Sequence, residues 1–269
     1  MSELSVFHFP ELFCFNLPVL ETETRIFVID TYMGPLSIKD VLDYCNKMKK
    51  RIYAVNTHSH FDHIWGNSAF KHFDIIAHSK CLELIVAEGE EILNDMSEKN
   101  PEMVKEHIEI TPPNLIFDRE LIFRDRDSTV KIKYLPGHSE DSSVIMVMPE
   151  NILLAGDMVE DPIPLLQGTH IDMYIKNLKY LDEMNFSRVI PSHGKRQDSS
   201  LIKDNIYYLE GLKEMVSQSF KKGKKPSEEN IKIDSFVPTE ITPFYIEEHK
   251  NNIKKVTEDL ENTNRDISL

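Results

Sequence analysis

Short apolar runs rich in β-branched residues alternate with polar turns and amphipathic stretches in the first third of the chain. Residues 25–31 (RIFVIDT), 51–57 (RIYAVNT) and 74–79 (DIIAHS) are typical of strands. Between the first two, Ser37 has the character of an N-cap, and apolar residues from 38 to 48 follow at helical spacing. Strands that alternate with helices in this way predict a layered α/β fold in which helices cover a sheet.

The pattern changes in the middle of the chain. Residues 80–110 have a helical spacing that is interrupted at Asn100-Pro101, and short strand-like runs separated by turn signals follow between residues 115 and 159. Thr169 then has the character of a second N-cap before another amphipathic stretch, and residues 188–192 (RVIPS) form the last clear strand.

Beyond about residue 199 the chain is charged and carries apolar stripes at helical spacing, such as Leu209, Leu212 and Val216. Most such stripes are packing faces, so we infer no cofactor site from them. We expect residues 1–198 to form the main domain. Residues 199–269 should form a helical extension that either packs over a site as a cap or serves as a dimer element.

Composition narrows the class of partner. The 269 residues carry a formal charge of −14, which opposes binding to nucleic-acid phosphates and to anionic membranes. No apolar run approaches the ~20 residues that span a bilayer, and the first residues lack the basic region of a secretion signal. The three cysteines are sparse and widely spaced, which suits a reducing compartment. We therefore expect a cytoplasmic protein that acts on a small-molecule substrate and has no nucleic-acid or membrane partner. Whether it forms a homodimer is left open by the sequence.

The densest chemical signal is the segment THSHFDH at residues 57–63. In an extended segment, side chains two residues apart point the same way, so His58 and His60 can converge on one ion. Asp62 and His63 lie where the chain turns into a helix and can project to a second point nearby. Imidazole and carboxylate at this density suit zinc, or iron and manganese with less preference; a cluster of hydrogen-bonded surface histidines is the alternative.

Three further residues share one context, because each follows directly after a strand-like run. They are His138 in LPGHS, Asp157 in LLAGDM and His193 in VIPSHG. A carboxylate after an apolar strand is costly to bury unless it is paired or bound to a metal. One such histidine alone would more often be structural, whereas the repeated context indicates a shared site.

The order H-x-H-x-D-H, P-G-H-S, G-D, S-H-G resembles the signature of the metallo-β-lactamase superfamily over roughly residues 25–195. The resemblance implies an α/β fold, a four-layer αββα sandwich with metals at one edge of the two sheets, followed here by the helical C-terminal extension. It also implies the roles of the site residues by position: His58, His60 and His138 on one metal, Asp62, His63 and His193 on the other, and Asp157 bridging both. Asp30, in VIDT, matches an early strand-end aspartate that orients a ligand histidine; a turn residue that caps the next segment is the alternative.

Such a site predicts a binuclear metal-dependent hydrolase with two divalent metal ions, zinc for preference and iron or manganese otherwise. Two cations that share a water generate hydroxide near neutral pH, and one of them polarises the bond under attack. Asp62 is the candidate catalytic residue because its carboxylate could steer the proton of the nucleophile. The substrate class stays open among an ester, a thioester, a lactone and a phosphoester.

Departures from particular branches of the superfamily narrow the function. Asp157 stands where true β-lactamases of this fold carry cysteine or serine, and His60 stands where oxygen-reducing di-iron members carry glutamate. The tyrosine typical of lactonases is missing after Asp157, although Tyr174 could substitute for it. Thioesterases of the glyoxalase II type remain possible, because they also combine this site with a helical C-terminal portion. Two alternatives stay open: an iron-dependent oxidoreductase or dioxygenase on the same fold, and a metal-stabilised interaction scaffold.

Residues 160–170 (EDPIPLLQGTH) should border the substrate pocket, because this segment begins directly after Asp157 and has no periodic pattern. Leu165 would then contact the substrate, and His170 would donate to a substrate oxygen. The alternative is that the leucines pack under the C-terminal helices and His170 is a solvated residue at a helix start.

Overall fold

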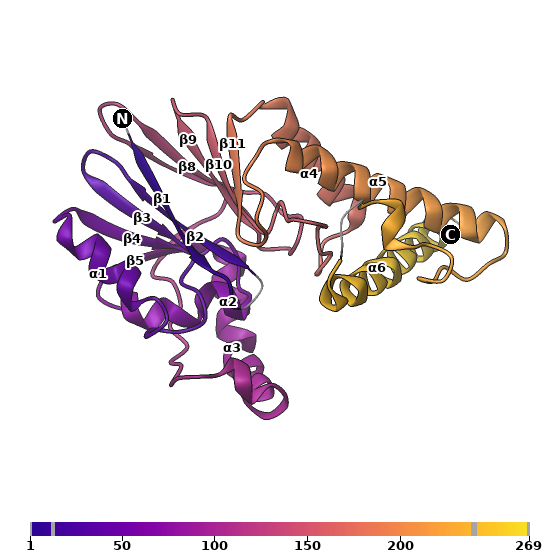
Figure 1. Cartoon of the computed structure of the whole chain (residues 1–269), viewed down its shortest axis with the longest axis horizontal. Helices are drawn as coiled ribbons and strands as arrows, with labels where there is room; N and C mark the ends of the chain where they lie inside the picture. The colour runs from indigo at the N-terminus through magenta and orange to yellow at the C-terminus, as the bar shows by residue number, and fades with distance from the viewer. Residues whose placement is uncertain (1, 12–13, 238–240, 268–269) are drawn as a thin grey trace.

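The structure, a computed structural model, describes residues 2–11, 14–237 and 241–267. Two β-sheets lie face to face, one group of helices covers the outer face of the first sheet, and a second group covers the second sheet (Figure 1). The predicted αββα sandwich with a helical C-terminal region is confirmed.

The first sheet contains strands in sequence order, β1-β2-β3-β4-β5-β6. Antiparallel pairing joins β1 to β2 and β2 to β3, and parallel pairing joins the remaining neighbours. The strands are β1 (Glu3–Phe9), β2 (Phe15–Glu21), β3 (Arg25–Ile29), β4 (Arg51–Val55), β5 (Asp74–His78) and β6 (Leu115–Phe117).

The second sheet has the order β11-β10-β9-β8-β7, antiparallel except for the parallel pair β10 and β11. Its strands are β7 (Glu120–Arg124), β8 (Thr129–Tyr134), β9 (Ser143–Met148), β10 (Ile152–Gly156) and β11 (Arg188–Pro191). The parallel pair places the ends of β10 and β11, after which Asp157 and His193 follow, at the same edge of this sheet.

Strand β3 shows why the central strands are apolar on both faces. Ile26 and Val28 pack among the residues under the helices of the first sheet, whereas Phe27 and Ile29 point into the interior between the sheets. Alternate residues of a strand face opposite sides, so a strand covered on both faces requires a continuous apolar run. The run RIFVI therefore fits a central strand of a layered fold.

Helices α1 (Lys39–Lys47) and α3 (Ser79–Lys99) cover the first sheet. Helix α4 (Ile171–Glu183) covers the second sheet, and α5 (Ser200–Lys221) and α6 (Pro243–Ile267) run beside it in the arm at the right of Figure 1. Short helical segments complete the chain: α2 (Phe61–Ile64), η1 (Trp65–Phe70), η2 (Pro101–Met103) and η3 (Ile233–Ser235). No helix in the described ranges is long and apolar enough to cross a membrane.

The C-terminal helices belong to the same core as the second sheet. Leu209, Leu212 and Val216 of α5 and Ile253 of α6 are buried in one apolar cluster with Leu153 of β10. The apolar stripes predicted along the tail are therefore packing faces.

Several local expectations were wrong. The Ser37 side chain bonds to Glu106 and caps no helix, since α1 begins at Lys39. The residue before α4 that accepts a bond from the helix is His170 rather than Thr169. The helical pattern predicted for residues 80–110 is interrupted at Asn100-Pro101 as expected, because α3 ends at Lys99, but the expectation of helix beyond this break was wrong, since no α-helix follows before residue 110.

Gly66, in η1, lies where the segment carrying the histidine motif packs against the end of β3. A Cβ built on Gly66 would stand 1.9 Å from the carbonyl oxygen of Thr31. We expect Gly66→Ala to lower the free energy of unfolding by about 1–3 kcal/mol, because the backbone at Thr31 must move to admit a methyl group. Chemical denaturation measures the change. Ser68→Ala in the same turn is the control, and equal stability of both variants would contradict the close packing.

Candidate metal centre

The turn between β4 and α2 presents the predicted histidine motif. Thr57 is fixed on both sides: its N–H donates to Asp30 Oδ1 at 2.8 Å, and its carbonyl accepts from Ser143 N–H in the second sheet at 2.8 Å. His60 has an extended backbone and directly precedes α2. The motif is thus anchored to both sheets, and its side chains face the edge where the two sheets meet.

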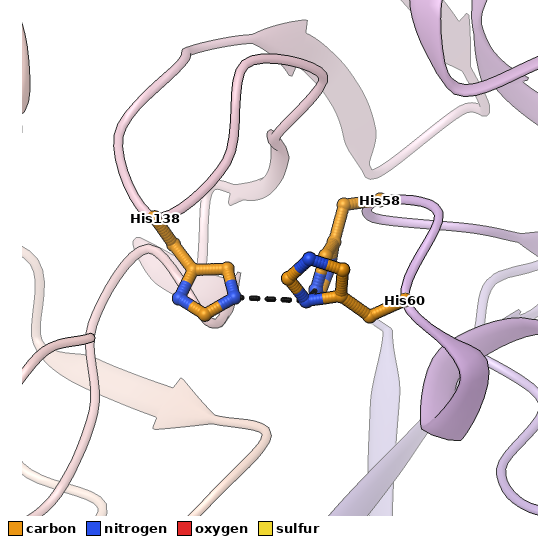
Figure 2. A group of neighbouring side chains, drawn as sticks. All are labelled: His58, His60 and His138. Atoms are coloured by element: carbon orange, nitrogen blue, oxygen red, sulfur yellow. Dashed lines mark hydrogen bonds between the residues drawn. The ribbon is translucent and has the colours of Figure 1, made fainter. Parts of the chain in front are cut away.

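One group of three imidazoles converges from this turn and from the loop before β9. Figure 2 shows the rings of His58, His60 and His138 pointing toward one another. The distance from His60 Nδ1 is 2.9 Å to His58 Nε2 and 3.0 Å to His138 Nε2. Three ring nitrogens this close are satisfied together by one central cation, because each can offer a lone pair to it.

Burial favours the neutral form of two of these imidazoles. It lowers the pKa of His58 well below its ordinary range, with nearby His63 and His60 acting in the same direction. Burial and nearby His138 lower the pKa of His60 to about 4. Metals bind the neutral imidazole, so the low pKa values of His58 and His60 suit metal binding.

A second group contains Asp62, His63 and His193, all buried. His193 Nε2 lies 3.3 Å from Asp62 Oδ2, and His63 Nε2 lies 3.7 Å from the same oxygen. His63 Nε2 is buried without a hydrogen-bond partner in the described structure. An orphaned ring nitrogen facing carboxylate oxygens fits a site for a cation.

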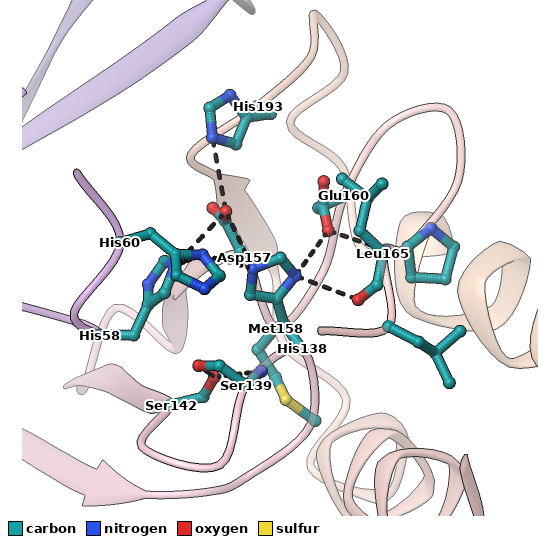
Figure 3. A network of polar contacts seen from close by, with 12 residues as sticks. His58, His60, His138, Ser139, Ser142, Asp157, Met158, Glu160, Leu165 and His193 are labelled. Atoms are coloured by element: carbon teal, nitrogen blue, oxygen red, sulfur yellow. Dashed lines mark hydrogen bonds and ion pairs between the residues drawn. The ribbon is translucent and has the colours of Figure 1, made fainter. Parts of the chain in front are cut away.

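Asp157 lies between the two groups, and Figure 3 shows its carboxylate between His193 of the second group and the three imidazoles of the first. Its Oδ2 is 3.3 Å from His63 Nε2 and 3.4 Å from His193 Nε2. The same oxygen is 3.7 Å from the Nε2 atoms of both His58 and His138. Its Oδ1 is buried without a hydrogen bond. A single carboxylate oxygen therefore faces both groups.

The charges of this cluster depend on one another. Although burial lowers the pKa of His63, the carboxylates of Asp157, Asp62 and Asp30 hold it well above its ordinary value. Burial raises the pKa of Asp157, but His63 and His193 together hold it well below the usual range. The histidines of the second group thus carry the positive charge that these carboxylates require, and divalent cations would supply the same compensation.

Asp30 orients His63 in the way the sequence predicted. His63 Nδ1 lies 2.9 Å from Asp30 Oδ2, which also accepts from the Thr57 hydroxyl at 2.9 Å. An ionised carboxylate only accepts hydrogen bonds, so His63 Nδ1 is the donor, and Nε2 is the nitrogen that a metal ion would occupy in place of a proton. Asp30 is fully buried with φ 63°, in the left-handed region that aspartate tolerates better than most residues.

Asn16 at the start of β2 holds the turn that carries His193. Its side-chain amide donates to the carbonyls of Pro191 at 3.0 Å and Gly194 at 2.9 Å. Its backbone N–H donates to Ser192 at 2.7 Å. This support was not predicted, because a single asparagine far away in the sequence gives no local signal.

Glu160 begins the segment that was predicted to border the pocket, and it does line the cleft, but its contact with His138 was not predicted. His138 Nδ1 lies 3.0 Å from the Leu165 carbonyl and 3.2 Å from Glu160 Oε1, and Glu160 Oε1 also accepts from the Leu165 N–H at 2.9 Å. These acceptors fix the proton on Nδ1 and leave Nε2 facing Asp157. A lone acid three residues after Asp157 was the only signal in the sequence.

Two buried asparagines on the C-terminal helices hold this loop. Asn205 of α5 pairs with the backbone of Glu160, accepting its N–H at 2.9 Å and donating to its carbonyl at 2.8 Å. Asn252 of α6 accepts from Leu166 N–H at 2.9 Å and donates to the Pro164 carbonyl at 2.8 Å. The helical extension therefore positions the residues that orient His138.

A cleft of about 190 Å³ opens beside the cluster. Its wall is formed by residues from both sheets' edges, the loop after β10 and helix α6: His60, Phe61, Asp62, His138, Asp157, Glu160, Leu165, Gln167, His193, Phe244, Tyr245 and Glu248.

Residues 160–170 fulfil both roles that the sequence left open, because part of the segment lines the cleft and part packs under the C-terminal helices. Leu165 lines the cleft, whereas Ile163 and Leu166 are buried in the core shared with the C-terminal helices. The expectation for His170 was wrong: its ring accepts a bond from Asp172 N–H at the start of α4 and does not line the cleft.

Comparison with known proteins agrees with this architecture. The family model described as "Metallo-beta-lactamase superfamily" matches residues 19–193. A "Metallo-beta-lactamase type 2" of Bacillus sp. (strain 170) is 28% identical over 197 residues, covering 68% of each chain. An "Acyl-coenzyme A thioesterase MBLAC2" of Gallus gallus is 25% identical over 201 residues, covering 66% of this chain and 72% of that protein. The crystal structure of DIM-1 metallo-beta-lactamase has a TM-score of 0.61 at 20% identity, covering 78% of this chain and 93% of that one, and shares the fold.

We expect Asn252→Ala to lower the free energy of unfolding by about 1–3 kcal/mol, because it leaves the buried backbone groups of Pro164 and Leu166 without partners. Urea denaturation measures the loss. The control is Asn251→Ala, the adjacent exposed residue, which should change stability by no more than about 0.5 kcal/mol. Equal effects of the two substitutions would show that the contacts of Asn252 do not hold the loop.

Proposed function

The chain belongs to the metallo-β-lactamase superfamily of metal-dependent hydrolases, and from this premise we propose that it is a binuclear enzyme that hydrolyses an ester or thioester. The observation that carries the proposal is the position of Asp157, whose single oxygen faces two separate groups of ligand atoms. A carboxylate in that position is suited to bridge two cations.

In this proposal the ligand atoms are those that already converge. His58 Nε2, His60 Nδ1 and His138 Nε2 would hold the first ion. Asp62, His63 and His193 would hold the second, and Asp157, which faces both groups, would contribute to each. Imidazole nitrogen and carboxylate oxygen are ligands that zinc accepts readily, and three imidazoles on one ion are typical of catalytic zinc.

The metal ions would supply an activated water and the positive charge that stabilises an oxyanion. Asp62 borders the cleft, and His63 and His193 lower its pKa against the effect of burial. As an ionised carboxylate, Asp62 accepts a hydrogen bond from the attacking water and orients its proton. Phe61 and Leu165 form an apolar wall of the cleft beside Asp62 and restrict the access of bulk water.

The cleft also bears on the substrate class. None of the described residues that line it is lysine or arginine, so neither the carboxylate of a β-lactam nor a phosphodiester would find a lysine or arginine partner there. We therefore favour esters and thioesters over β-lactams and phosphodiesters. Acyl transfer from sulfur is also the activity named for the thioesterase relatives, which share about a quarter of their aligned residues with this chain.

The helical region 199–269 acts as a cap in this proposal. Helix α6 supplies Phe244, Tyr245 and Glu248 to the wall of the cleft, and Tyr245 donates to the carbonyl of Asp161 at 3.1 Å. A helix that forms part of the cleft favours the cap over the dimer element among the two roles the sequence left open.

An iron-dependent oxidoreductase is the second candidate, and one observation favours it. The second group consists of two histidines and one carboxylate, the set used by many non-haem iron oxygenases. The three imidazoles of the first group favour a hydrolytic zinc site instead. Zinc-loaded protein should hydrolyse members of a panel of esters, thioesters, lactones and phosphodiesters; oxygen uptake by the iron-loaded protein without hydrolysis would support the oxidoreductase.

We expect Asp157→Ala to lose both metal ions and at least about a thousandfold in kcat/KM, because it removes the ligand shared by both groups. His193→Ala should retain the ion on His58, His60 and His138 and lose the other. Elemental analysis after dialysis and initial-rate kinetics measure these effects.

The control is His72→Ala, which removes an exposed histidine and should leave metal content unchanged. If Asp157→Ala kept two ions per chain, the bridging role would be refuted.

A further inference from the structure

The wall of the cleft on the side of α6 is aromatic and acidic. Phe244, Tyr245 and Glu248 are close in sequence, and residues four apart on a helix lie on the same face. The rings of Phe244 and Tyr245 meet edge to face, with 5.1 Å between their centroids. Phe61, from the histidine motif, adds a third ring to the lining.

The carboxylate of Glu248 has no cation beside it among the contacts of the described chain. Its side-chain hydrogen bond is with the Asn251 amide at 3.3 Å, whereas the adjacent Glu247 pairs with Lys250 at 2.8 Å. Burial raises the pKa of Glu248 above its ordinary value. A partly buried carboxylate without a cationic partner is costly unless a ligand supplies the missing charge.

A second carboxylate in the same cleft is also incompletely paired. Glu160 is fully buried and lines the cleft, and its Oε1 takes the contacts with His138 and Leu165. Its Oε2 is buried without a hydrogen-bond partner in the described structure. Asp62, Asp157 and Glu160 are each engaged with a histidine, so Glu248 is the carboxylate of the lining that has no such partner among the described residues.

We propose that Glu248, Phe244 and Tyr245 form a subsite for an organic ammonium group carried by the substrate. Carboxylate and aromatic faces together are the chemistry that recognises such cations, since the ring quadrupole and the anion attract the same charge. The inference rests on the proposed function, and it narrows the substrate to an ester or thioester whose acyl or leaving portion bears an amine or a quaternary ammonium.

A binding comparison tests this without requiring turnover. Choline and 3,3-dimethylbutan-1-ol have the same shape, with nitrogen replaced by carbon, so their affinity ratio reports the contribution of the charge. Isothermal titration of the zinc-loaded protein should give choline about tenfold tighter binding than the alcohol. Glu248→Gln should bring the ratio close to one, and Glu247→Gln, one residue along the helix and exposed, should keep it.

Two results would overturn the subsite. One is equal affinity for the two compounds in the unaltered protein. The other is loss of zinc in Glu248→Gln with the ratio preserved, because Glu248 would then only balance the charge of the metal ions.

Turnover separates the subsite from the proposed function. Acetylthiocholine and S-(3,3-dimethylbutyl) thioacetate form the matching pair of thioesters. Hydrolysis of both at equal rates would contradict the subsite and support the hydrolase. Preference for choline in binding, with no hydrolysis across the ester and thioester panel, would support the subsite and contradict the hydrolase.

Discussion

The burial of Asp157 among imidazoles is the constraint on which the rest of this structure depends. Its Oδ2 lies within 3.7 Å of the Nε2 atoms of His58, His63, His138 and His193. A carboxylate this deeply buried is stable only when positive charge surrounds it, and removing that charge is far more costly than removing a surface ion pair. The edge of the sandwich is organised to meet that requirement: His58, His60, His138, Asp157 and His193 lie in loops that follow strands, and Asp62 and His63 lie in the short helix α2.

The supporting contacts divide between the two halves of the molecule. Asp30, at the end of β3, fixes the ring of His63. Glu160, after β10, fixes the ring of His138 and is itself held by Asn205 of α5. The C-terminal helices thus contribute twice, to the orientation of a ligand and to the wall of the cleft. The loop after β10 contacts His138 on one side and is hydrogen-bonded to α5 on the other. We therefore expect metal binding to depend on how the C-terminal helices pack.

The parts that the sequence predicted well have local causes. The order of strands and helices follows from the spacing of apolar residues, and the convergence of the candidate metal-binding residues follows from one dense motif and the repeated context of residues after strands. The contacts of Glu160 with His138, at 3.2 Å, and of Asn252 with Leu166, at 2.9 Å, were not predicted because they join residues that are distant in the sequence. The role of His170 was predicted wrongly because the same sequence allows a histidine before a helix either to cap that helix or to face a cleft. Strand β2 was not predicted, since Pro18 interrupts its apolar pattern.

We propose that two metal ions occupy the cluster, one on each side of Asp157. An anomalous difference map from a crystal of the zinc-loaded protein, recorded at the zinc absorption edge, tests this proposal. We expect two peaks, one within ligand distance of His58, His60 and His138 and the other within ligand distance of Asp62, His63 and His193, with the carboxylate of Asp157 contacting both. A single peak, or two peaks that do not share Asp157, would contradict it.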